Sequence, residues 1–68
     1  MNLQQVADEA MAYLDSVGVA ADWSIIPLSK VDALMVNTDI DFHIYFIDDD
    51  IDNFRLEIMR EYPQKSPN

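Results

Sequence analysis

The densest group of side chains that could do chemistry is a set of four aspartates within five residues: Asp48, Asp49, Asp50 and Asp52. Clustered carboxylates suit calcium, so an EF-hand loop beginning at Asp48 is the first pattern to compare. Such a loop requires Gly at its sixth position and Glu at its twelfth. The chain has Asn53 and Met59 there. The sequence therefore predicts no specific metal site and no cofactor, and it leaves open only loose binding of divalent ions.

These aspartates also have an ordinary structural interpretation. The residues that follow them have the apolar spacing of a helix, and an aspartate at a helix N-cap accepts hydrogen bonds from backbone N–H groups that lack partners. Further carboxylates near that end are favoured by the helix dipole. Capping explains one or two of the acids but not all four, because like charges repel. The excess acids are therefore candidates for function.

Catalysis has little support in the sequence. His43 is the only histidine, and the chain has no cysteine and one glycine. No serine lies in a recognisable nucleophile motif, and no glycine-rich loop is present to bind phosphate. We expect His43 to lie exposed or half-exposed on a strand, and we expect the protein not to be an enzyme.

The charge of the chain is its extreme feature. Thirteen acids against four bases give a formal net charge of −9, and residues 31–54 contain seven acids and no Lys or Arg. Such a chain repels nucleic acid and anionic membranes and attracts basic surfaces. We therefore expect a basic protein as partner, with no direct contact to nucleic acid or membrane. The absence of cysteine and of a recognisable signal peptide favours a cytoplasmic location.

The spacing of apolar residues predicts two helices and three strands. Residues 2–17 form the first helix, with Asn2 and Gln5 placed to cap its start and Gly18 to end it. Residues 23–28, 33–37 and 40–47 are predicted strands, and Pro27 places the first of them at a sheet edge because it lacks an N–H donor. Residues 50–62 form the second helix, which Pro63 ends, and residues 63–68 are a polar tail expected to fray.

This order of elements predicts the fold class. A helix, three strands and a second helix within 68 residues give one α+β domain, residues 1–68. We expect a three-stranded antiparallel sheet with both helices on one of its faces.

The third predicted strand decides which residues are left uncovered. One side of it is wholly apolar and is expected to face the core: Ile40, Phe42, Ile44 and Phe46. The other side carries His43, Tyr45 and Ile47. Tyr45 and Ile47, with Met35 as a candidate third member, would then form an uncovered apolar patch bordered by acids, as interaction surfaces often do.

The acids suggest that the protein mimics nucleic acid. Asp39 and Asp41, two apart on a strand, would project to the same side about 6.6 Å from each other. Together with the aspartates at 48–52 they could resemble the charge of a nucleic-acid backbone. The sequence thus favours a small inhibitor of the phage or mobile-element type, which occupies the basic surface of a DNA- or RNA-binding protein.

Two alternatives stay open. An adaptor, chaperone or immunity-type module would bind its partner through the apolar patch at Tyr45 and Ile47 and use the acids for steering. An accessory subunit would be acidic only for solubility. The patch could also close a homodimer, which is a common way for a small domain to bury more area.

Overall fold

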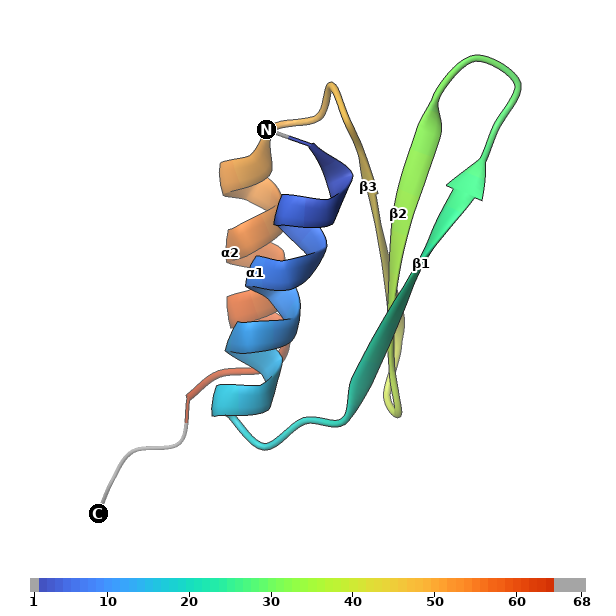
Figure 1. The fold of residues 1–68 in the computed structure, drawn as a ribbon. Helices are drawn as coiled ribbons and strands as arrows, with labels where there is room; N and C mark the ends of the chain where they lie inside the picture. Colours follow the sequence, from blue (N-terminus) through green and yellow to red (C-terminus); the bar gives the residue numbers. More distant parts are fainter. Residues whose placement is uncertain (1, 65–68) are drawn as a thin grey trace.

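The fold, taken from a computed structural model that describes residues 2–64, is a helix, a three-stranded sheet and a second helix (Figure 1). The elements are α1 (Leu3–Ser16), β1 (Ala21–Pro27), β2 (Asp32–Thr38), β3 (Phe42–Phe46) and α2 (Ile51–Glu61). The strands are antiparallel in the order β1-β2-β3, and both helices lie on the same side of the sheet. The predicted fold class is confirmed. Residues 65–68 of the predicted tail lie outside the described residues.

Both ends of α1 are fixed by the residues predicted to do so. The Asn2 side chain accepts from Gln5 N–H at 2.9 Å, and the Gln5 side chain accepts from Asn2 N–H at 3.1 Å, which completes a capping box. At the other end Gly18 adopts a φ of 76°, a conformation that L side chains rarely adopt. Gly18 N–H then donates to Asp15 O and Val19 N–H to Leu14 O, so the last carbonyls of α1 have partners.

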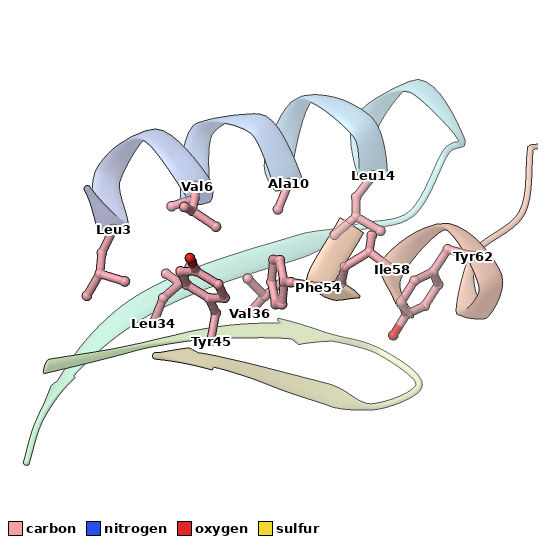
Figure 2. Packing of buried hydrophobic residues seen from close by; sticks show 11 residues of the cluster. Leu3, Val6, Ala10, Leu14, Leu34, Val36, Tyr45, Phe54, Ile58 and Tyr62 are labelled. Atoms are coloured by element: carbon pink, nitrogen blue, oxygen red, sulfur yellow. The ribbon is translucent and has the colours of Figure 1, made fainter. Parts of the chain in front are cut away.

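The core lies between the helices and the inner side of the sheet (Figure 2). The buried residues of α1 are Leu3, Val6, Ala7, Ala10 and Leu14, and they face Leu34 and Val36 of β2. Phe54, Ile58 and Tyr62, from α2 and the residue that follows it, fill the space beside them. Each layer buries an apolar stripe that it could not bury alone.

The register of the sheet assigns each strand residue to one of its two sides. Leu34 pairs with Ile25 and Tyr45, and Val36 pairs with Trp23 and His43. Because residues directly opposite one another in a sheet point to the same side, Tyr45 and His43 belong to the side that faces the helices. They are 5% and 4% exposed.

The predicted orientation of β3 is therefore wrong. His43 and Tyr45 face the core, whereas Phe42, Ile44 and Phe46 face away from the helices and are 57%, 41% and 37% exposed. The predicted core residue Ile40 lies in the turn before β3 and is 67% exposed. The physical reason is the pairing with Leu34 and Val36, which fixes the side of every residue in β3. The polar atoms that this orientation buries all have hydrogen-bond partners.

Candidate partner-binding surface

The side of the sheet opposite the helices has no helix over it within residues 2–64 (Figure 1), and it carries several exposed apolar side chains. We call this surface the outer face and define it by five side chains: Ile26, Met35, Phe42, Ile44 and Phe46. They come from all three strands.

Register places the outer-face residues side by side. Met35 lies opposite Ile44, and Ala33 lies between Ile26 and Phe46 in neighbouring strands. Ala33 is fully buried although it points outward, because the larger side chains on either side can cover its methyl group. These apolar side chains form a patch on the sheet, as the centre of a protein interface often does, and Ser24, Asn37 and Asp22 lie on the same side and border the patch.

Two aspartates accept hydrogen bonds at the two ends of the free edge of β3. The outward-pointing N–H of Phe42 donates to Asp41 Oδ1 at 2.8 Å, and that of Phe46 donates to Asp49 Oδ2 at 3.2 Å. An edge strand with open N–H groups invites pairing with another chain, and charged side chains discourage it. Asp41 and Asp49 therefore discourage strand pairing at the two ends of the β3 edge, and the outer face beside that edge is uncovered.

Two more of the predicted site aspartates have partners on α2. Asp50 is the N-cap and accepts from Asp52 N–H at 3.0 Å, as the capping interpretation expected. The Asp52 carboxylate lies 3.0 Å from Arg55 Nη1, and Arg55 also binds both carboxylate oxygens of Glu9 on α1. The hydrogen bond with Glu9 is the main cause that raises the pKa of Arg55 above its ordinary value.

Asp39 and Asp48 differ from the other four aspartates. Both are exposed, and among residues 2–64 neither carboxylate makes a hydrogen bond or ion pair within the chain. Asp39 lies in the turn between β2 and β3, and Asp48 lies in the connection from β3 to α2. The expectation that Asp39 and Asp41 project from a strand is wrong, because β3 begins at Phe42.

The acids occupy both ends of β3 rather than one row. Asp39 and Asp41 precede the strand, and the group at 48–52 follows it, so the two groups lie at opposite ends of the sheet (Figure 1). The outer-face residues of β3 lie between them. The acids that the sequence suggested as a single charged surface are thus divided by an apolar one.

Tyr45 and Ile47 do not form the predicted patch. Tyr45 is buried, its hydroxyl donates to Asp49 O at 2.9 Å, and its ring lies 5.2 Å from that of Phe54. Burial, followed by the charges of Asp49, Asp50 and Asp48, raises the pKa of Tyr45 above 10.0. Ile47 is 45% exposed beside Leu3 and Ile25, toward the start of α1. Only Met35, of the residues predicted for the patch, lies on the outer face.

His43 has a structural environment. Its Nε2 atom lies 3.0 Å from the Tyr62 hydroxyl, which lies 2.6 Å from Thr38 Oγ1, and its Nδ1 atom lies 3.6 Å from Glu57 Oε1. The Tyr62 carbonyl accepts from the Tyr13 hydroxyl at 2.7 Å. These contacts join β2, β3, α1 and the end of α2. Within residues 2–64 no group of three or more His, Asp or Glu side chains is placed to hold a metal ion.

Comparison with known proteins gives no relative: no protein family matches the sequence, and no curated protein or solved structure shows significant similarity. Neither of the helices described is long and apolar enough to cross a membrane.

Proposed function

We propose that this chain is a small acidic protein-binding module that contacts its partner through the outer face. The observation that carries the proposal is the orientation of β3, whose phenylalanine and isoleucine side chains are exposed on a sheet that has helices on its other side only. Covering these side chains with a partner removes apolar area from water, which is the main favourable term in most protein associations.

The charge of the chain points to the kind of partner. At a net charge of −9 it is attracted to basic surfaces, among them those of proteins that bind DNA or RNA. With such a partner, the acids raise the association rate and the specificity of binding, while the outer face supplies the affinity.

Mimicry of nucleic acid is the second candidate, and it is supported by the exposed carboxylates of Asp39 and Asp48. Carboxylates that make no contact within the chain are available to the Lys and Arg side chains that a nucleic-acid-binding partner uses to bind phosphates. The local roles of Asp41, Asp49 and Asp50 reduce the number of acids that mimicry would use. We therefore place mimicry second to binding through the outer face.

The test is capture of partners from nuclease-treated lysate of the native cells by tagged variants. Phe42→Thr/Ile44→Thr makes the outer face polar while it keeps strand-favouring side chains. Leu56→Gln is the matched control, because Leu56 is 61% exposed on α2, in the other layer. We expect the double variant to lose a partner that the wild type and the control retain. Retention of every partner by the double variant, with loss on Asp39→Asn/Asp48→Asn, would instead favour mimicry.

A further inference from the structure

The charges around the outer face limit what can cover it. Asp41 and Asp48 are seven residues apart, which at about 3.3 Å per residue places them at most about 23 Å from each other. Between them the outer side of β3 is apolar. Within residues 21–50, which include the strands and their turns, Lys30 is the only Lys or Arg. An occupant of this face therefore meets apolar side chains in the middle and carboxylates beyond both ends of β3.

A hollow beside the outer face also combines an apolar side chain with carboxylates. It lies between β3 and α2, has a volume of about 270 Å³, and includes Ile44 in its lining. Its lining includes the carboxylates of Asp49, Asp50 and Glu57, and no Lys or Arg is among its lining residues. A cationic side chain that reached past Ile44 would enter a space bordered by carboxylates.

A second copy of this chain is a poor occupant. Two sheets that pack face to face in an aligned dimer, with the twofold axis across the strands, place the ends of one β3 over the ends of the other. Both ends are acidic, so acids oppose acids in that arrangement, and in any arrangement each copy carries a net charge of −9 that opposes association. At sheet separations of about 10 Å, and with a screening length of about 8 Å in physiological salt, that repulsion is only partly removed.

We propose that the occupant of the outer face is a different protein, whose contact surface has an apolar centre bordered on both sides by Lys or Arg. The apolar centre covers Met35, Ile44 and their neighbours, and the cations lie against the acids at the two ends of β3. This inference rests on the proposed function and specifies the chemistry of the partner.

The test uses two synthetic amphipathic helical peptides with the same leucine-rich face. One carries a lysine pair at each end and the other a glutamate pair, with the pairs about 15 residues apart to match about 23 Å at 1.5 Å per residue. Each is titrated into the isotope-labelled protein and followed by NMR. We expect the lysine peptide to shift the Met35 and Ile44 signals and to bind about tenfold tighter than the glutamate peptide at low salt. Added NaCl should reduce the difference in affinity between the two peptides.

Charge-matched variants identify the acids responsible. Asp39→Asn/Asp48→Asn should reduce the preference for the lysine peptide, whereas Asp15→Asn/Glu61→Gln, which removes two exposed acids from the helices, should retain it. Equal affinities for the two peptides at the outer face would overturn the charge inference and leave the docking surface intact. Failure of the lysine peptide to bind would also overturn the charge inference. Shifts confined to α1 and α2 would contradict the proposed function itself.

Self-association is measured in the same samples by analytical ultracentrifugation. We expect a monomer at the concentrations used for the titration. A dimer that Phe42→Thr/Ile44→Thr abolishes and Leu56→Gln retains would make a second copy the occupant and would overturn the inference.

Discussion

Tyr45 shows how a single side chain can mislead an interpretation from sequence. On an alternating strand, a tyrosine next to acids suggests an exposed contact residue, and Phe42 and Ile44 suggest core. The structure buries the tyrosine because its hydroxyl reaches the Asp49 carbonyl and its ring packs near Phe54. A buried tyrosine with its hydroxyl paired keeps the apolar contribution of its ring without an unsatisfied polar group.

The burial of Tyr45 predicts a loss of stability in alkali. The unfolded chain releases the phenol proton near pH 10.0, while the folded state holds it to higher pH because the pKa is raised. Above pH 10.0 the folded state therefore binds more protons than the unfolded state, so its stability is retained below that pH and falls as the pH rises toward the folded pKa. Urea unfolding of wild type and Tyr45→Phe, below and above pH 10.0, checks this. The variant should lose less stability in alkali. Identical pH dependences of the free energy of unfolding for the two proteins would contradict the raised pKa of Tyr45.

Two substitutions can separate the helix-capping role of Asp50 from the effect of its charge. Asp50→Ala removes the N-cap of α2 and should cost about 1 kcal/mol, whereas Asp50→Asn keeps a capping oxygen and should change stability little. Urea unfolding of the two variants compares them directly. Equal losses would mean that the carboxylate charge, rather than the cap, is what the position needs.

The ends of the elements are connected by one group of hydrogen bonds. Tyr62 follows α2 and contacts Thr38 at the end of β2 and His43 in β3 through its hydroxyl, while its carbonyl accepts from Tyr13 in α1. If the Thr38 hydroxyl donates to Asp41 O, as its 3.0 Å distance allows, Tyr62 donates to Thr38 and accepts from His43. Every hydroxyl then has a defined partner, and α2 is attached at its C-terminal end as well as along its apolar stripe.

This group of contacts predicts the cost of removing one hydroxyl. Tyr62→Phe leaves His43 Nε2 without a partner in a buried site and should lower the free energy of unfolding by about 1–3 kcal/mol. Tyr13→Phe removes a hydrogen bond at a half-buried position and should cost less, about 1 kcal/mol. Urea denaturation of both variants measures the difference. A Tyr62→Phe variant as stable as wild type would show that the hydroxyl contacts contribute nothing.

The helices and the three antiparallel strands were predictable from sequence, and the orientation of β3 was predictable in principle. The helices have regular apolar spacing, a capping box at Asn2 and a glycine at position 18, each of which acts locally. Because four residues, an even number, separate the paired Asn37 and Phe42, Leu34 and Val36 share a side with His43 and Tyr45. The greater apolarity of Phe42, Ile44 and Phe46 hid that constraint. The outer face was therefore missed because its side chains have the composition of a core.

At the scale of the whole molecule, charge opposes folding as well as selecting partners. With thirteen acids and four bases, the compact state brings like charges together, and dissolved salt screens their repulsion. We expect the free energy of unfolding to rise with NaCl concentration, measured by urea denaturation at low and high salt. Asp39→Asn/Asp48→Asn should show a smaller rise. A fall in stability with salt would show that ion pairs such as Arg55 with Glu9 outweigh the repulsion.

The orientation of β3 determines the candidate surface and everything proposed from it. Its most direct test is NMR of the dilute protein with a soluble paramagnetic agent, which broadens the signals of atoms that solvent can reach. We predict that the Phe42 and Ile44 side-chain signals broaden strongly, while those of Tyr45 and Ile58 are protected. Protection of Phe42 and Ile44 together with broadening of Tyr45 would mean that β3 presents its other side to the core, and the outer face would then not exist.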